Sequence, residues 1–208
     1  MISTWDRMYV LPADLSYEPG YSDSIAGVAE ARGVHVREAL MDVMADGRPI
    51  LFLLGNYRGS LDGQVTGIEH DDSVFGLSDG GAHCGALCDA SVPTYMLAYM
   101  TRDRTKGPKM ALEFVVHKMT QDTALLYGLA DRGVIAPGYR ADLNLIDYDT
   151  LRLHEPQMVY DLPAGGRRLI QRADGYRMTV CNGEVTYENG EHTGAYPGRL
   201  IRGAKTTG

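Results

Sequence analysis

The sequence predicts an α/β fold in which amphipathic helices alternate with short buried strands. Residues 50–54 form an unbroken apolar run, which is the composition of a strand buried on both faces of a parallel sheet. A second short apolar run, residues 74–77, also has the composition of a buried strand. It is followed by Ser78 and Asp79. The segment between the two runs has helical periodicity. An order of helix, strand, helix and strand is the pattern of a parallel sheet.

Three segments justify the helical part of this prediction. Ser24, with the two residues before it, is expected to cap a helix that runs to about Arg32. Residues 36–47 place apolar side chains at helical spacing and end in glycine. Residues 60–70 form a shorter third segment. Residues 1–23 are rich in proline, tyrosine and acidic residues, so an irregular surface segment is expected there.

The helical pattern resumes after residue 88. Residues 89–100 are expected to be helical, and the charged residues 102–107 are expected to form a solvated turn. Pro108 suits the first turn of the next helix, because proline lacks the amide hydrogen that this position leaves unused. The buried face of that helix is expected to carry Leu112, Val115, Val116 and Met119.

Two charged residues lie beside this predicted buried face. His117 and Lys118 are expected to be partly exposed helix residues. Thr120 is expected to cap a further short helix, which ends at Gly128.

After residue 138 the apolar residues no longer follow the spacing of a helix. Residues 141–147 alternate partly between apolar and polar and predict a strand. A long polar stretch with Pro156 and Pro163 follows. Residues 177–187 contain two alternating runs joined by Asn-Gly, and this pair supplies the positive φ angles of a type I′ hairpin turn.

The candidate functional residues follow the second apolar run. The carboxyl end of a buried parallel strand faces a cleft in α/β proteins, and Asp79 is expected at such an end. Gly80 and Gly81 allow the backbone to turn sharply, and His83 follows in the same loop. A carboxylate fixed in this way suits a general base or a metal ligand. A tight turn with a solvated aspartate is the alternative, and these residues leave both open.

Composition excludes several classes of protein. The 208 residues carry a formal net charge of −7, which argues against a general nucleic-acid or membrane-surface partner. No run approaches 18 apolar residues, so no membrane-spanning helix is expected. The first twenty residues lack the pattern of a signal peptide, and the three cysteines form an odd set, so a cytoplasmic location is expected. Cys84 and Cys88 are expected to be small structural residues rather than metal ligands, because no second pair completes four ligands.

Several stretches together resemble one family. GLSDGGAH at residues 76–83, DRGVIAPGYRADLNLID at 131–147 and VCNGEVTYENGE at 180–191 resemble the C-terminal part of amidohydrolases. The second stretch is common to many amidohydrolases. Together with LYGLADRG at 126–133 and DLPAGGRRLIQRADGYRMTV at 161–180, it is similar to the N-acyl-D-amino-acid deacylase (D-aminoacylase) branch.

This resemblance implies a TIM barrel flanked by a small β-sandwich. A complete barrel needs about 250 residues, so this chain would hold only an incomplete one. Residues 1–135 would be the C-terminal segments of the (β/α)8 barrel, and the strand that ends at Asp79 would be its eighth. Residues 136–208 would supply β-sandwich strands and a C-terminal arm.

The resemblance also implies a metal-dependent amide hydrolase. Asp79 would contact a zinc site and act as general base toward metal-bound water. Ser78, Gly80, Gly81 and His83 would support the substrate or the aspartate. The family's main metal ligands, which include a His-x-His pair, have no counterpart here. The six histidines are scattered: His35, His70, His83, His117, His154 and His192.

Three functions stay open at this point. The first is part of a zinc enzyme that deacylates N-acyl-D-amino acids, inactive as this chain alone. The second is another amidohydrolase reaction, such as cyclic-amide hydrolysis or deamination, and the third is a catalytically silent module. The expected partner is a small-molecule N-acyl amino acid, whose carboxylate Arg102, Arg104 or another basic group could bind. A partial barrel exposes sheet edges and apolar faces, so a homo-oligomer is also considered.

Overall fold

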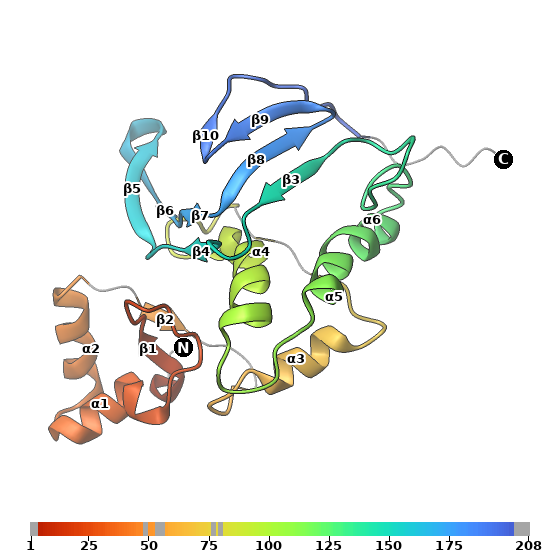
Figure 1. Cartoon of the computed structure of the whole chain (residues 1–208). Helices are drawn as coiled ribbons and strands as arrows, with labels where there is room; N and C mark the ends of the chain where they lie inside the picture. The colour runs from red at the N-terminus through yellow and green to blue at the C-terminus, as the bar shows by residue number, and fades with distance from the viewer. Residues whose placement is uncertain (1–3, 48–49, 53–56, 76–77, 79–80, 202–208) are drawn as a thin grey trace. The chain divides into compact units, whose positions relative to one another are not determined.

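The computed structural model describes residues 4–47, 50–52, 57–75, 78 and 81–201 (Figure 1). The chain forms two compact units. One contains Met1–His70 and Thr105–Pro108, and the other contains Asp71–Arg104 and Lys109–Gly208. Helices and antiparallel strands are both present, so the α/β class is confirmed. The predicted division between residues 135 and 136 stays a prediction.

The first unit is mainly helical. Its elements are β1 (Met8–Val10), α1 (Ile25–Arg32), α2 (Val36–Ala45), β2 (Ile50–Phe52) and α3 (Asp62–Glu69). The predicted cap is confirmed, because the Ser24 hydroxyl accepts a hydrogen bond from the amide of Gly27 at 3.0 Å. The buried carboxylate of Glu18 accepts a hydrogen bond from the Leu61 amide at 2.7 Å. This bond links the loop before α1 to the start of α3.

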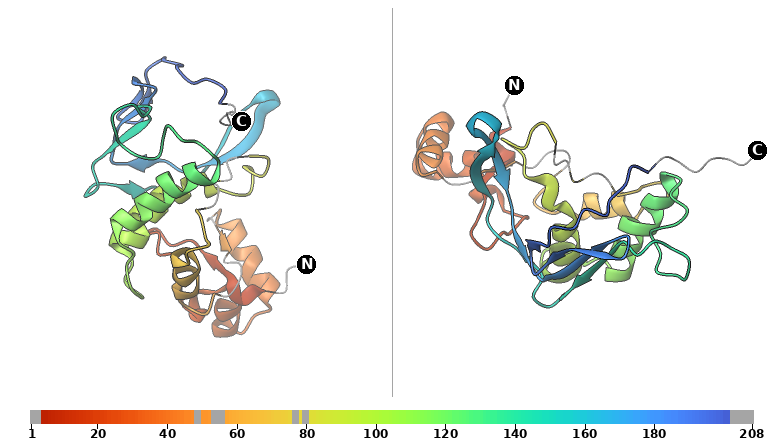
Figure 2. Two further views of the ribbon diagram at one scale, coloured as in Figure 1. Left: turned by 90° about the vertical axis from the view of Figure 1, so that its right-hand side faces the viewer. Right: turned by 90° about the horizontal axis from the view of Figure 1, so that it is seen from above.

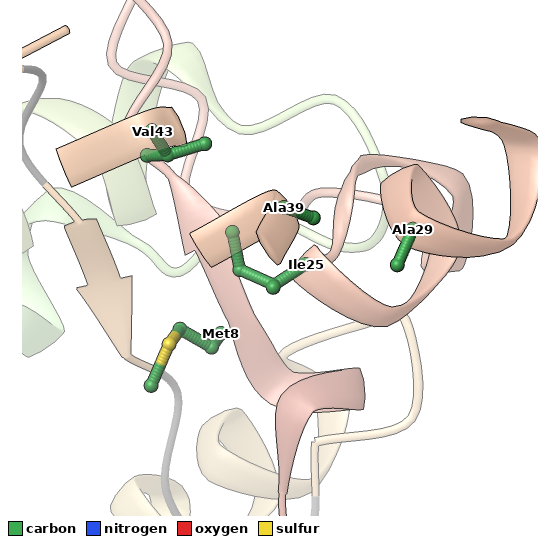
Figure 3. Packing of buried hydrophobic residues seen from close by; sticks show 5 residues of the cluster. All are labelled: Met8, Ile25, Ala29, Ala39 and Val43. Carbon is green, nitrogen blue, oxygen red and sulfur yellow. The ribbon is translucent and has the colours of Figure 1, made fainter. Parts of the chain in front are cut away.

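The core of this unit lies between α1, α2 and β1 (Figure 3). Ile25 and Ala39 are fully buried, and Val43 keeps only 5% of its surface exposed. Met8 from β1 and Ala29 from α1 complete the cluster. The spacing of Ala39 and Val43 is the helical i, i+4 repeat that the sequence predicts for this segment.

The strand pairing in this unit corrects the sequence prediction. Residues 50–52 form a strand, as expected, but β2 pairs antiparallel with β1, with Tyr9 opposite Leu51. β1 lies in the segment that was expected to be irregular. The composition of an apolar run predicts that a strand is buried, but it specifies neither the partner nor the direction of pairing. A three-residue partner more than thirty positions away leaves no local signal.

The helices of the second unit do not have the predicted bounds: the first runs past residue 100, and the second begins at Leu112 and not at Pro108. A short 3-10 turn (Asp89–Ser91) leads into α4 (Val92–Tyr95), which continues as a π-helix over Met96–Asp103. Likewise α5 (Leu112–His117) continues through a π-helical segment (Lys118–Asp122) into α6 (Thr123–Leu126). The helix therefore does not restart at Thr120, whose hydroxyl donates to the carbonyl of Val116 at 2.7 Å.

Two charged residues of this unit are buried, contrary to the sequence prediction. Arg104 was expected in a solvated turn, but it is fully buried at the end of the π-helix, where its amide donates to the Tyr99 carbonyl. Lys118 was expected to be partly exposed, but only 5% of its surface is accessible. Val116, expected to be buried, is 42% exposed. Arg104 follows a π-helix, whose residues depart from the 3.6-residue spacing of an α-helix.

The strands of the second unit are short and antiparallel in the described residues. They are β3 (Leu143–Ile146), β4 (Arg152–Leu153), β5 (Gln157–Leu162), β6 (Gly166–Ile170), β7 (Ala173–Asp174), β8 (Tyr176–Cys181), β9 (Glu184–Glu188) and β10 (Glu191–His192). A four-stranded sheet has the order β10-β9-β8-β3. β4 pairs with β7, and β5 pairs with β6 as a hairpin apart from the larger sheet (Figure 2).

The predicted hairpin of residues 177–187 is confirmed. β8 and β9 pair on either side of Asn182 and Gly183, whose φ angles are 51° and 84°. Both angles fall in the left-handed region, as a type I′ turn requires. The polar stretch around Pro156 and Pro163, for which the sequence predicts no particular element, forms β5 and β6. The turn between these two strands contains Pro163, at a position where no backbone amide hydrogen bond is required.

In the described part of the chain, no helix is both long enough and apolar enough to cross a lipid bilayer.

Candidate active site

The structure describes part of the predicted loop. Ser78 is half-buried, and Gly81 and His83 are exposed. Asp79 and Gly80 lie outside the described residues, so their predicted position stays a prediction. Upstream, Val74 and Phe75 do not lie in a strand, and Val74 is 44% exposed. The predicted buried strand is therefore wrong at these two residues, because a short apolar run does not specify a pairing partner.

The N-terminal side of this loop is held by a buried lysine. The ammonium of Lys118 donates to the carbonyl oxygen of Ser73 at 2.7 Å. The same ammonium lies 3.8 Å from a carboxylate oxygen of Asp122 and 5.7 Å from the centre of the Phe114 ring. Lys118 comes three residues after the fully buried Val115, so its helical spacing was a signal for its buried position.

The C-terminal side of the loop is held by β6 and the residue after it. The Cys84 carbonyl accepts a hydrogen bond from the Leu169 amide at 2.6 Å. Seven residues later, the Ser91 hydroxyl donates to the side-chain oxygen of Gln171 at 2.5 Å. Within the loop, the His83 carbonyl accepts from the amides of Ala86 and Leu87 at 2.8 and 2.9 Å. These bonds form a compact turn against the β5–β6 hairpin.

The two sets of contacts bracket the predicted catalytic segment. Ser73 precedes it and Cys84 follows it, and both are bound by backbone or side-chain donors of the second unit. Sequence reasoning found the segment but neither of the contacts that hold it.

The described residues of this region do not form a metal site. Nowhere in residues 4–47, 50–52, 57–75, 78 and 81–201 do three His, Cys, Asp or Glu side chains gather closely enough to hold a metal ion. Cys84 and Cys88 are free and half-buried. Burial, reinforced by the nearby charge of Asp89, raises the pKa of the Cys88 thiol. This shift disfavours the thiolate that a metal would require.

The arginines that were considered for binding a substrate carboxylate have structural contacts. The guanidinium of Arg102 donates to both carboxylate oxygens of Asp103, at 2.6 and 2.8 Å. It also donates to the carbonyl of Tyr148, and to that of Leu151 at 2.6 Å. Arg102 thus ties the π-helix to the chain before β4, whereas Arg104 is fully buried. These contacts give no reason to assign either arginine to the binding of a substrate carboxylate.

A cavity of about 420 Å³ lies elsewhere in the second unit. It is bounded by residues 128–132, by Arg140 and Asp142, by the β8–β9 turn and by residues 197–201. Arg132 donates to Asp131 at 3.2 Å and to Asp142 at 3.0 Å. Arg140 donates to Asp131 at 2.6 Å. We call the four charged residues Asp131, Arg132, Arg140 and Asp142 the ion-pair junction.

The ion-pair junction also binds the neighbouring hairpin. The Asp142 carboxylate accepts a hydrogen bond from the backbone amide of Asn182 at 2.7 Å. The Arg140 guanidinium donates a hydrogen bond to the side-chain oxygen of Asn182 at 3.3 Å. Hydrogen bonds from Arg140 and Arg132 hold the pKa of Asp131 below its usual range. The four charges of the junction are therefore paired with one another. From the sequence, this part of the chain was predicted only as a turn followed by a strand.

Comparison with known proteins identifies related chains. The model of the Amidohydrolase family matches residues 66–187. A protein of Mycobacterium tuberculosis of uncharacterised function is 28% identical over 188 residues, which cover 83% of this chain and 29% of that protein. An N-acyl-D-aspartate deacylase of Alcaligenes xylosoxydans xylosoxydans is 36% identical over 109 residues, covering 52% of this chain and 19% of the deacylase.

A D-aminoacylase of the same Alcaligenes is 34% identical over 106 residues, covering 51% of this chain and 19% of that enzyme. The predicted resemblance to this branch is therefore confirmed. The chain spans about 29% of the length of the first of these curated relatives. Among solved structures, a D-aminoacylase crystal structure is 25% identical to this chain, with a TM-score of 0.47. The match covers 91% of this chain and 36% of the D-aminoacylase chain. A second one, a D-aminoacylase with a binuclear metal centre, has the same scores.

Proposed function

This chain belongs to the amidohydrolase family, and from that premise we propose that it is part of an amide hydrolase that removes the acyl group from N-acyl-D-amino acids. The observation that carries this proposal is the 36% identity to an N-acyl-D-aspartate deacylase over half of the chain. The D-aminoacylase relative supports the same substrate class. Both relatives are much longer than this chain, so the activity is proposed for a longer polypeptide that contains it.

The proposed architecture is a partial TIM barrel in residues 1–135 and β-sandwich strands in residues 136–208. The four-stranded sheet supports the second part. Leu143 opposes Val180, and Leu145 opposes Met178, so these four side chains share one face of the sheet. Leu145 is 59% exposed. A sheet with one apolar face is typical of half of a sandwich, because a second sheet covers that face.

We assign the catalytic role to Asp79, as general base toward the water that attacks the amide carbonyl. A carboxylate can take that proton when it lies within hydrogen-bonding reach of the water. Ser73 and Cys84, which precede and follow this aspartate in the sequence, both accept hydrogen bonds from other parts of the second unit. Ser78, Gly80, Gly81 and His83 are proposed to shape the substrate site around it.

Zinc stays a prediction for the longer enzyme. The described residues do not fit a zinc site, because no three candidate ligands among them lie together. We therefore derive no step of the reaction from a metal. When bound, zinc would supply Lewis-acid polarisation of the amide carbonyl, with ligands that come mainly from outside the described residues.

The test uses the longest natural polypeptide that contains these 208 residues. Hydrolysis of N-acetyl-D-amino acids would be compared with that of the L-enantiomers, a cyclic amide and an aminated heterocycle. Preference for the D-amides is expected. Turnover of the cyclic amide or of the heterocycle alone would favour a different amidohydrolase reaction, and no turnover of any substrate would favour a silent module.

The role of Asp79 is tested in the same polypeptide. Asp79→Asn removes the base but keeps the size of the side chain, so kcat is expected to fall by roughly 10²–10⁴-fold. Asp71→Asn, in an exposed position eight residues earlier, is the matched control and should leave kcat unchanged. Near-normal turnover of the Asp79 variant would remove that residue from catalysis.

A further inference from the structure

We propose that the cavity beside the ion-pair junction binds a small organic carboxylate, with Arg199 as its main cation and with Arg140 and Asn182 as further donors. The ligand class is a carboxylate attached to a short apolar chain. This inference goes beyond the proposed function, because it concerns the cavity and does not depend on deacylase activity.

The carboxylate oxygens of the ion-pair junction are already engaged. Asp131 accepts from Arg132 through Oδ1 and from Arg140 through Oδ2. Asp142 accepts from the backbone amide of Asn182 through Oδ1 and from Arg132 through Oδ2. Each carboxylate oxygen thus has a donor of its own, so the junction has little capacity left to accept hydrogen bonds from a ligand.

The donors of the same wall are not fully used. Arg140 donates through Nε to Asp131 and through Nη1 to Asn182, and a guanidinium carries more N–H groups than these two bonds require. The Asn182 side chain presents its oxygen to Arg140, because a guanidinium cannot accept a hydrogen bond. Its amide N–H groups have no acceptor in the described part of the chain. Both residues line the cavity, so its wall has more donors than acceptors, as an anion requires.

Arg199 adds a charge that the junction does not pair. It lines the cavity from the C-terminal segment 197–201. Within the residues that the structure describes, its guanidinium makes neither an ion pair nor a hydrogen bond. Two aspartates and three arginines line this cavity, so the wall carries one positive charge in excess. A guanidinium binds a carboxylate through two parallel hydrogen bonds, and one carboxylate would neutralise this excess.

The volume and the apolar part of the wall indicate the rest of the ligand. The cavity of about 420 Å³ has the size of a small-molecule site. Leu200 and Ile201 line it and are 79% and 46% exposed. A short hydrocarbon chain that covers these side chains is favourable, because apolar surface leaves water. A carboxylate with a few carbon atoms therefore fits this cavity better than inorganic phosphate, which has no apolar part.

The test follows Cys181, a free and half-buried thiol that lines the same cavity. In the longest natural polypeptide that contains this chain, iodoacetamide labels the thiols, and peptide mass spectrometry gives the rate at Cys181 alone. Butyrate is the probe, at constant ionic strength. A ligand this small should bind at roughly millimolar concentration, so about 20 mM butyrate should slow labelling of Cys181 about fivefold. Labelling of Cys84, which lies outside the lining residues, should not change.

Three related molecules test the recognition in the wild type. Butyramide has a similar shape without the charge, butylamine carries the opposite charge, and inorganic phosphate has the charge without the apolar chain. Each is expected to protect Cys181 less than butyrate does. Equal protection by any of the three would overturn the inference, as would a lack of protection by butyrate.

Variants test the role of the arginine. Arg199→Gln removes the cation, so protection by butyrate should fall from about fivefold to less than about twofold. Arg199→Lys keeps the charge without the planar donor pair and should protect to an intermediate extent. Arg172→Gln, at an exposed position outside the lining residues, is the matched control and should keep full protection.

Unchanged protection in Arg199→Gln, or an equal loss in Arg172→Gln, would refute the site. If Arg199→Gln does not fold, the four ligands decide in the wild type alone. Labelling requires no turnover, so it separates this inference from the proposed function. Protection by butyrate in a polypeptide without deacylase activity would refute the proposed function and leave the site standing. An active deacylase in which Cys181 is not protected would refute the site alone.

Discussion

Two glycines of the stretch at residues 131–147 offer a sharp test of how this part of the chain packs. Gly133 and Gly138 have almost the same backbone angle, with φ of 83° and 88°. A Cβ atom added at Gly133 would lie 2.8 Å from the Thr120 carbonyl oxygen and 2.9 Å from the Ala124 Cβ. A Cβ atom added at Gly138 would have no neighbour within 4 Å.

The expected magnitudes follow from these distances. Alanine in the left-handed region costs about 1–2 kcal/mol at either position. At Gly133 the collision with the backbone of the helix adds about 1–3 kcal/mol, because Thr120 lies in the π-helical segment and cannot move alone. Gly133→Ala should therefore lose about 2–5 kcal/mol of unfolding free energy, and Gly138→Ala only about 1–2 kcal/mol.

Urea unfolding followed by far-UV circular dichroism measures the difference. The single tryptophan, Trp5, lies in the first unit, so its fluorescence would not report on this region. A gap of about 2 kcal/mol corresponds to a difference of roughly 1 M in the urea midpoint. Equal losses in the two variants, within about 0.5 kcal/mol, would refute the close packing of Gly133 against the helix.

Three further outcomes are expected. Ser24→Ala should lower the unfolding free energy by about 1 kcal/mol through loss of the helix cap, whereas the exposed Ser22→Ala should change it less in the same urea assay. The pKa of Asp131 is lowered by its arginine partners, so it adds stability above about pH 4 that is lost on further acidification. Thermal unfolding between pH 6 and 2 should therefore depend less on pH in Asp131→Asn than in Asp71→Asn. Asn182→Ala should weaken the β8–β9 hairpin, because its φ of 51° disfavours alanine; faster amide exchange in both strands would show this.

Local chemistry explains the parts of the fold that the sequence predicts well. The cap at Ser24 depends on its own helix, and the hairpin turn depends on Asn182 and Gly183. In both cases the residues that determine the structure are neighbours in the chain. Single-sequence reasoning therefore places these elements within a residue or two.

Contacts between distant segments explain what the sequence could not predict. The strand β1 exists because β2 pairs with it across about 40 residues. The burial of Lys118 depends on the carbonyl of Ser73, and its charge made exposure the natural expectation. For the candidate site, the sequence indicated a loop and its polar residues. The anchors that fix this loop lie on β6 and on the helix that follows α5.

The ion-pair junction has a consequence for how the hairpin is held. Asp131, Arg132, Arg140 and Asp142 bind one another and the Asn182 turn, so the shared stretch of residues 131–147 works as a joint between helix and hairpin. The bonds of this joint are made entirely by the protein's own residues, so substitution of any of the four charged residues should loosen the hairpin whether or not a ligand is bound.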